Sequence, residues 1–274
     1  MRFDVIGYWS EIKLDIIKEY AAAYSTILAA QQKPRLHHVY IDAFAGAGIH
    51  LSKVTKEAIS GSPLNALSIT PRFREYHLID LDGDKIDLLR RIIGERPDVH
   101  TYTGDCNKVL LQDVFPQVRY EDFRRGLCLL DPYGLHLNWD VVQNAGEMKS
   151  IEIFINFPIM DINRNALWKN PERVAESNTK RMSAFWGDDS WRSIAYSTER
   201  NLFGEPEKED NITIVNAYRE RLKSTAGFSY VPEPIPMRNT KGAEVYYLFF
   251  ASHKAAAAHI IRDIFNKYRK RGTK

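Results

Sequence analysis

Short apolar segments alternate with amphipathic helical segments through residues 37–157, and this alternation constrains the fold more than any other feature of the chain. The expected strands are residues 39–41, 76–80, 99–103, 126–130 and 151–157. Ile86, Leu89 and Ile93 recur at helical spacing and predict a helix over 84–93. Strands that alternate with helices form a parallel sheet with helices on both faces. The chain is therefore predicted to be an α/β protein.

The two ends of the chain add to this sheet. Apolar residues at three- and four-residue spacing predict one helix over 9–30 and another over 254–270. Residues 228–237 and 245–252 are extended runs around a glycine-containing turn, which predicts an antiparallel hairpin. Five parallel strands closed by a hairpin resemble the mixed seven-stranded sheet of class I methyltransferases, a Rossmann-like fold. Here that sheet has extra N- and C-terminal helices.

Residues 160–223 break the alternation, because they are mostly polar and compatible with helix. Their landmarks are Trp168, Trp186, Trp191 and an expected loop over 203–211. The tryptophans can form the core of a small helical layer or stack on nucleic-acid bases, and the sequence leaves both open. A length of 274 residues suits one large α/β domain with an insertion. We therefore expect a single domain over 1–274, with residues 160–223 as a helical cap on its substrate side.

The positive charge of the chain is concentrated at its C-terminal end. The net charge is +3, yet six basic residues and one acid lie between 262 and 274, so the remaining body is slightly acidic. The basic residues are Arg262, Lys267, Arg269, Lys270, Arg271 and Lys274. They either end a solvated helix, whose dipole they complement, or contact phosphate. The body does not have the charge of a protein that binds nucleic acid strongly by itself.

The cysteine and histidine content argues against a disulfide framework and against a metal site. Cys106 and Cys128 are the two cysteines, and His37 and His38 have no third ligand at metal-binding spacing. The sequence has no apolar run long enough to span a membrane, and its N-terminus lacks the apolar segment of a signal peptide. We expect a cytoplasmic protein that binds neither metal nor membrane.

The loop after the first strand, in the sequence YIDAFAGAG, is the first candidate site. Ligands of open α/β sheets bind beyond the carboxyl ends of the strands, and glycine lets the backbone approach them closely. Asp42, Phe44, Gly46 and Gly48 are therefore predicted to hold the amino-acid end and ribose of a cofactor; the alternative is a turn without a ligand. A dinucleotide fingerprint needs a third glycine, and this chain has Leu51 there, with no immediate helix.

Acidic residues follow the second and third expected strands. Asp80 or Asp82 can accept hydrogen bonds from both ribose hydroxyls of a cofactor, and Asp84 is expected to cap the next helix. Asp105 can accept from an adenine amino group or can cap the helix that follows it. Cys106 belongs to the same predicted cofactor site, as a small packing residue rather than a nucleophile.

The sequence LLDPYGL, directly after the fourth expected strand, is the most specific candidate. The Asp131 carboxylate and the Pro132 carbonyl are acceptors for an exocyclic amine, and the Tyr133 ring can stack on a planar base. These three residues are predicted to be catalytic; the alternative is a proline-stiffened turn. The predicted substrate-binding residues are Gly134, Asn156 and Arg164. Arg164 can instead pair with Asp161.

The chain contains, in this order, WSEIKLDIIKEYAAAYSTIL, YIDAFAGAG, GSPLNAL, LIDLDGDK, GDCN, LLDPYGLHLNW, INFPIMDINR and YYLFFASHK. Together these motifs resemble the bacterial three-Cys-motif partner (TcmP) family, over most of residues 9–165 and 243–265. The resemblance implies a protein similar to S-adenosylmethionine (SAM)-dependent methyltransferases. It also implies a partner with a three-cysteine motif, suggestive of a radical-SAM-like iron–sulfur protein.

The Asp-Pro turn departs from the Asp/Asn-Pro-Pro-aromatic pattern of amino-methyltransferases, because Tyr133 replaces the second proline and Gly134 follows. A similar Asp-Pro-aromatic-Gly turn is seen in tRNA guanine-N2 dimethylating enzymes. Three functions stay open: a SAM-dependent methyltransferase acting on a nucleobase amine in RNA or DNA, a SAM-binding partner or regulatory subunit with little activity, and a nicotinamide-dependent Rossmann enzyme. The Asp-Pro-Tyr turn favours the first over the second, and the missing third glycine disfavours the last.

Overall fold

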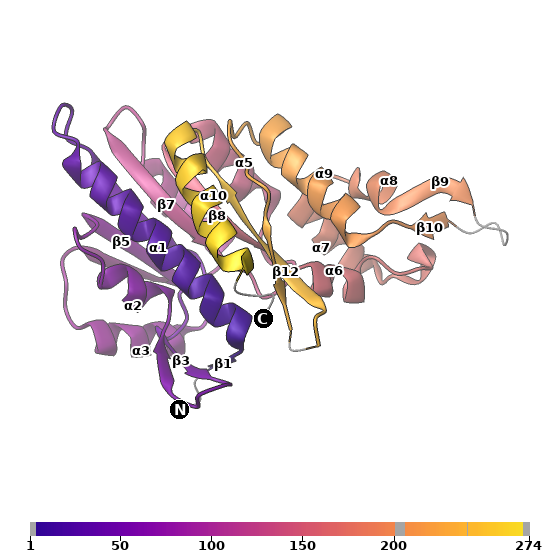
Figure 1. Cartoon of the computed structure of the whole chain (residues 1–274), viewed down its shortest axis with the longest axis horizontal. Helices are drawn as coiled ribbons and strands as arrows, with labels where there is room; N and C mark the ends of the chain where they lie inside the picture. The colour runs from indigo at the N-terminus through magenta and orange to yellow at the C-terminus, as the bar shows by residue number, and fades with distance from the viewer. Residues whose placement is uncertain (1–3, 201–205, 240, 271–274) are drawn as a thin grey trace.

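A mixed seven-stranded sheet forms the centre of the molecule (Figure 1). The computed structural model describes residues 4–200, 206–239 and 241–270. In spatial order the strands are β11 (Ile235–Arg238), β12 (Glu244–Ala251), β8 (Ile151–Phe157), β7 (Arg124–Leu130), β2 (His37–Asp42), β5 (Glu75–Asp80) and β6 (Val99–Thr103). β12 is antiparallel to β8 and β11, and the other neighbours are parallel. This is the class I methyltransferase arrangement, which confirms the predicted fold class.

Helices cover both faces of the sheet (Figure 1). On one face are α1 (Tyr8–Ala30), α2 (Ser62–Leu67), α3 (Gly83–Ile93) and α10 (Ala255–Arg269). On the other are α4 (Cys106–Val109), a π-helical segment (Leu110–Val114), a 3₁₀ turn (Phe115–Gln117) and α5 (Trp139–Met148). Leu127 and Leu129 of β7 join the first core, whereas Cys128 and Leu130 join the second, since successive strand residues point to opposite faces. None of the helices in the described parts of the chain is both long and apolar enough to cross a membrane.

A small second sheet, which the sequence did not predict, forms beside the glycine-containing loop. It consists of β1 (Asp4–Ile6), β3 (Ile49–Ser52) and β4 (Ala58–Ser60), with β3 in the middle. β1 pairs in parallel with β3, so the start of the chain is tied to the loop region. The helix α2 begins at Ser62, directly after β4, and Gly61 is its N-cap residue.

The segment 160–223 contains helices and also an unexpected hairpin. Its elements are α6 (Ile159–Asn165), a 3₁₀ turn (Pro171–Arg173), α7 (Glu176–Trp186), α8 (Trp191–Ala195), β9 (Tyr196–Arg200), β10 (Pro206–Lys208) and α9 (Asn211–Ser224). β9 and β10 pair antiparallel, so the loop predicted over 203–211 is wrong at β10; residues 203–205 lie outside the described residues. Trp186 and Trp191 are buried, as the helical-layer interpretation predicts, whereas Trp168 is exposed.

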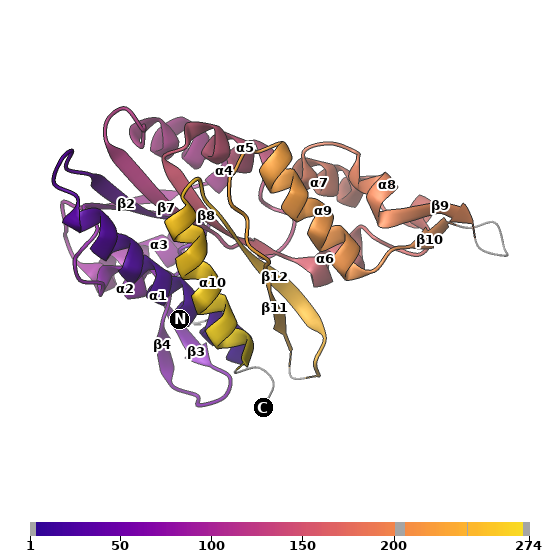
Figure 2. The same cartoon turned by 45° about the horizontal axis from the view of Figure 1, so that its top comes forward.

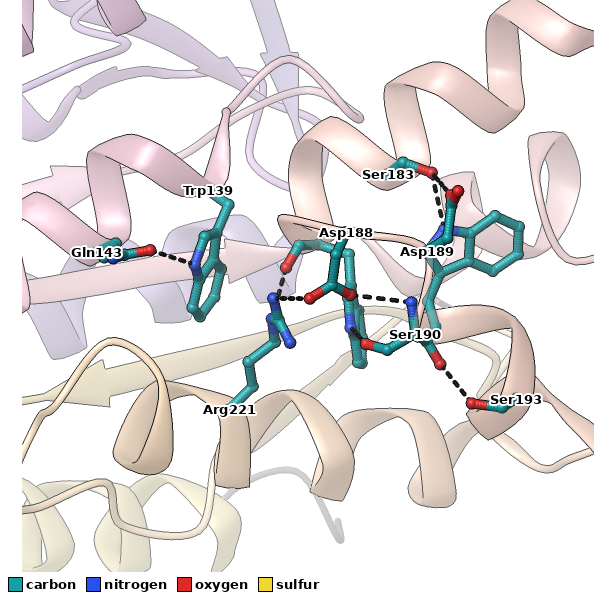
Figure 3. Close-up of polar contacts among 10 residues, drawn as sticks. Trp139, Gln143, Ser183, Asp188, Asp189, Ser190, Ser193 and Arg221 are labelled. Carbon is teal, nitrogen blue, oxygen red and sulfur yellow. Dashed lines mark hydrogen bonds and ion pairs between the residues drawn. The ribbon is translucent and has the colours of Figure 1, made fainter.

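Arg221 of α9 joins this segment to the sheet-covering helix α5 (Figure 3). Its guanidinium carbon lies 4.8 Å from the ring centre of Trp139 and 5.9 Å from that of Trp186. Its Nε donates to the Trp186 carbonyl at 2.6 Å, and its Nη2 donates to Asp188 at 2.6 Å. A cation close to two indole rings, with two of its N–H groups hydrogen-bonded, fixes the packing of α9 and α7 on α5.

Candidate cofactor and substrate site

The candidate site lies where the connections of the sheet diverge. β2 and β7 are neighbours at the centre of the sheet; the next strand after β2 in the sheet, β5, lies on its far side, and the next strand after β7, β8, lies on the opposite side. Figure 2 shows β2, β7 and β8 next to one another. Such a switch point leaves a crevice beyond the carboxyl ends of the two central strands. Asp42 pairs with Leu129 across β2 and β7, so the loop after Asp42 and the turn at Asp131 are neighbours.

Asp42 is fully buried under the glycine-containing loop. Its carboxylate accepts hydrogen bonds from the Phe44 amide (3.2 Å), the Tyr40 hydroxyl (3.4 Å) and the Ser62 hydroxyl. Burial raises the pKa of Asp42 to about 7, although these hydrogen bonds act in the opposite direction. The carboxylate thus supports the loop from the core side, and its contact with a cofactor stays a prediction.

The two glycines of the loop have different roles. Both have a left-handed backbone, with φ of +62° at Gly46 and +79° at Gly48. A Cβ on Gly48 would lie 2.6 Å from Leu89 of α3, so this glycine permits close packing. A Cβ on Gly46 would meet nothing within 4 Å, so Gly46 borders open space, where a ligand can approach the backbone. Phe44 is partly buried against the core of the second face.

Asp80 holds the loop in place from the end of β5. Its Oδ2 accepts from the Gly46 amide at 2.8 Å, and its Oδ1 accepts from the Asp82 amide at 2.9 Å. Each carboxylate oxygen has a second acceptor position, which suits a ribose hydroxyl. Asp82, rather than Asp84, is the N-cap of α3, and its side chain accepts from the amides of Asp84 and Lys85. The predicted capping role of Asp84 is therefore wrong.

Asp105 caps α4, which was the structural alternative for this residue. Its Oδ1 accepts from the amide of Asn107 at 3.0 Å and from the Asn107 side chain at 2.9 Å. Asn107 also donates to the His136 carbonyl (2.9 Å) and accepts from the Asn138 amide (2.7 Å), so it ties α4 to the segment after the Asp-Pro turn. No sequence pattern singles out Asn107. Burial raises the pKa of Cys106 to about 12, which suits a packing residue.

Asp131 is paired with a residue that the sequence did not single out. Lys13 of α1 donates from Nζ to Asp131 Oδ2, and the two side chains are 10% and 25% exposed. The same Nζ lies 5.1 Å from the ring centre of Tyr246. The carboxylate keeps its second oxygen, Oδ1, for a further donor. A lysine at this position has the helical spacing of the buried face of α1, and that spacing is the only local signal for it.

Pro132 and Tyr133 form the turn that follows Asp131. The Pro132 carbonyl accepts from the buried Asn156 side chain at 3.3 Å, and a carbonyl has a second lone pair for another donor. The Asn156 Oδ1 is buried and has no partner among the described residues. Tyr133 is 81% exposed, so its ring is accessible to a planar ligand. The structure thus brings Asn156 to the predicted catalytic turn.

Of the other two predicted substrate-binding residues, Gly134 is part of this turn, whereas Arg164 is exposed on α6. A Cβ on Gly134 would lie 2.7 Å from Asp161 Oδ2, so Gly134 allows α6 to approach the turn. Asp161 accepts from Asn165 at 2.7 Å, and this replaces the pairing with Arg164 that the sequence left open. The Arg164 side chain is exposed on α6, and its carbonyl accepts from Trp168 Nε1 at 2.6 Å.

Comparisons with known proteins support the fold. No family model and no curated protein matches the chain. Among solved structures, protein LPL1258 from Legionella pneumophila, described with the family DUF519, has a TM-score of 0.53 and 11% identity over 93% of this chain and 91% of that chain. At this identity the similarity shows the fold alone.

Two methyltransferases are also similar, with lower TM-scores. A putative SAM-dependent methyltransferase from Listeria monocytogenes has a TM-score of 0.44 and 12% identity, over 85% of this chain and 99% of that chain. The plantazolicin methyltransferase BamL, solved with SAH, has a TM-score of 0.38 and 8% identity, over 90% and 88%. Membership of the TcmP family stays a prediction.

Proposed function

We propose that the protein is a SAM-dependent methyltransferase that acts on an exocyclic amine of a nucleobase in RNA or DNA. One observation carries the proposal: the turn Asp131–Gly134 leaves β7 at the switch point, next to the glycine-containing loop that leaves β2. Acceptors for an amine and a backbone loop bordering open space therefore occur on adjacent strands. The glycine-containing loop, Asp80 and the Asp-Pro turn also occur along the chain in the order that the methyltransferase-like motifs predict.

The residues at the end of β5 and in the loop fit the cofactor. Asp80 offers acceptors for ribose hydroxyls, and the backbone at Gly46 is accessible to a ligand. Leu81 follows Asp80 directly and is 76% exposed, so it offers an apolar surface for the adenine ring. SAM would supply a methyl group on a positively charged sulfur. Asp82 and Asp105 each cap a helix through one oxygen and keep the other as an acceptor.

The acceptors of the turn would orient the amine. The lone pair of an aromatic amine is delocalised into the ring, so acceptors on its hydrogens help to localise that pair and fix the direction of approach. Asp131 and the Pro132 carbonyl are those acceptors in the proposed reaction, and Asn156 holds the carbonyl in place. Tyr133, which is exposed beside them, would stack on the base.

A methyl-transfer assay tests this function. Tritium-labelled SAM is incubated with total RNA and with total DNA, and label in nucleic acid is counted for wild type and Asp131→Ala. Alanine removes the acceptor, so we expect turnover to fall about a hundredfold while SAM affinity changes only a few-fold. Asp140→Ala, which changes an exposed acid on α5, is the control. Equal labelling by wild type and Asp131→Ala would contradict the role of Asp131.

A second candidate function is a cytoplasmic SAM-binding subunit for a three-Cys-motif, radical-SAM-like partner. The ion pair between Lys13 and Asp131 favours it, because the proposed acceptor already has a counter-ion. The slightly acidic body also leaves affinity for nucleic acid to a partner. SAM binding without methyl transfer, even with the candidate partner present, would support this function over the first.

A further inference from the structure

Lys13 places a positive charge against the acid of the candidate acceptor site. The lysine is buried, it donates to Asp131 Oδ2, and its Nζ lies over the Tyr246 ring at 5.1 Å. Burial alone lowers the pKa of a lysine, but attraction by Asp131 and the other groups around it outweighs burial and raises the pKa of Lys13. The lysine is therefore a permanent hydrogen-bond donor at the site, and it is largely shielded from bulk water.

Two ion pairs lie close to the turn. Lys13 pairs with Asp131, and Lys85 pairs with Asp4 at 2.8 Å. The lysine at the candidate acceptor site therefore already has its counter-ion, and a substrate amine meets a paired carboxylate there.

The Lys13 ammonium is a donor, and Asp131 and the Pro132 carbonyl are acceptors, so together they suit a substrate that has an amine with an acceptor beside it. An ammonium has three N–H donors, of which Asp131 takes one and the Tyr246 ring faces another. When the hydrogens of a substrate amine lie on Asp131 and the Pro132 carbonyl, the remaining lysine donor can meet an acceptor beside that amine. Adenine and cytosine have an unprotonated ring nitrogen there on the Watson–Crick edge, whereas guanine has N1–H, a second donor.

We propose that Lys13 is a specificity-determining residue that selects a nucleobase with an unprotonated ring nitrogen beside its exocyclic amine on the Watson–Crick edge, as in adenine and cytosine. This inference rests on the proposed function. It adds a substrate class that excludes guanine, whose amine has N1–H beside it on that edge. It also assigns a role to α1, a helix outside the alternating core of the fold.

Methyl transfer to defined oligonucleotides tests the inference. Single-stranded RNA and DNA oligonucleotides carry one adenine, cytosine or guanine among uracils or thymines, and the label comes from tritiated SAM. The methylated base is then replaced by 1-deazaadenine or 3-deazacytosine, which lack the ring nitrogen. We expect this replacement to lower kcat/KM of the wild type about tenfold to a hundredfold, the effect of one hydrogen bond to a charged group. Lys13→Met should show the same loss with the parent base and no further loss with the deaza base.

Lys18→Met is the matched control, because Lys18 is an exposed lysine on the same helix. The deaza oligonucleotides test wild-type protein, so the outcome does not depend on the folding of Lys13→Met. Methylation of guanine, or undiminished methylation of the deaza base, would overturn the inference. SAM binding with no methylation of any oligonucleotide would overturn it too, but would leave the cofactor site standing. Absence of SAM binding would overturn the proposed function itself.

Discussion

Asp131 stabilises the fold as well as forming part of the candidate site. Its removal leaves Lys13 buried without a counter-ion. We predict that Asp131→Ala lowers the free energy of unfolding by about 2–3 kcal/mol, less than for a fully buried pair because the Asp131 side chain is partly exposed. Lys13→Met combined with Asp131→Leu removes both charges and should recover most of this loss. Urea unfolding measures both, with Asp140→Ala as control; a loss as small as the control's would contradict the buried pair.

Asp42 makes the stability of the protein depend on pH. Its pKa is about 7 in the folded protein, against an ordinary value near 3.8, because the carboxyl is buried. Between these values the folded state holds a proton that the unfolded chain has lost, so stability falls as the pH rises from about 4 to 7. We predict that Asp42→Asn flattens this fall, which amounts to at most about 1.4 kcal/mol per pH unit.

Denaturant unfolding across this pH range measures the effect. Glu152 contributes a background to this measurement, because burial raises its pKa to about 6. Its titration also lowers stability as the pH rises, and it does so equally in wild type and in the variant. The comparison is therefore the difference between the two curves, not the slope of either one. Parallel curves for wild type and Asp42→Asn would show that Asp42 is ionised in the folded protein throughout.

At the scale of the elements, the two glycines of the glycine-containing loop differ in role: Gly48 packs against α3, whereas Gly46 borders open space. Gly48→Ala places a Cβ 2.6 Å from Leu89 on a left-handed backbone, so it should destabilise the protein more than Gly46→Ala does. Gly46→Ala carries only the left-handed strain, about 1–2 kcal/mol. Thermal unfolding of the two variants measures this order. The reverse order would mean that the loop packs differently from the structure described here.

The segment 160–223 is predicted to depend on the rest of the chain. Its side chains Phe185 and Tyr218 pack against Phe157 of β8, with ring centres 5.7 and 4.7 Å away, and Tyr218 also contacts Phe249 of β12. Expressed alone, the segment loses these contacts and should show no cooperative thermal transition by circular dichroism. A sharp transition in the isolated fragment would instead identify it as a second domain.

The sequence predicted the elements that are buried and missed those that are short. The central strands β7 and β8 are mostly buried and apolar, since helices cover both faces of the sheet, so they were recognisable as apolar runs. β3, β4, β9 and β10 have three to five residues, too few for a clear alternation of apolar and polar side chains. The N-cap of α3 was misplaced by two residues, because aspartates occupy both Asp82 and Asp84 and either can cap a helix.

At the scale of the whole molecule, strand order located the candidate site, but long-range contacts completed it. Asp42, Asp80 and Asp131 were predicted because each lies at or directly after the carboxyl end of a strand, and the carboxyl ends of parallel strands lie at one edge. Lys13 is separated from Asp131 by 118 positions and meets it only because α1 packs across the sheet. No local pattern encodes such a contact. The same holds for Asn156, which reaches the Pro132 carbonyl from β8.

Calorimetric titration of SAM into the intact protein tests the central claim, a cofactor site at the switch point, most directly. We predict binding of SAM and of S-adenosylhomocysteine to wild type, no heat with NAD, and loss of SAM binding in Gly46→Val, whose side chain enters the space beside the loop. Gly94→Val is the matched control, because Gly94 also has a positive φ and open space around it but ends α3 away from the site. Heat with NAD and none with SAM or S-adenosylhomocysteine would contradict the claim.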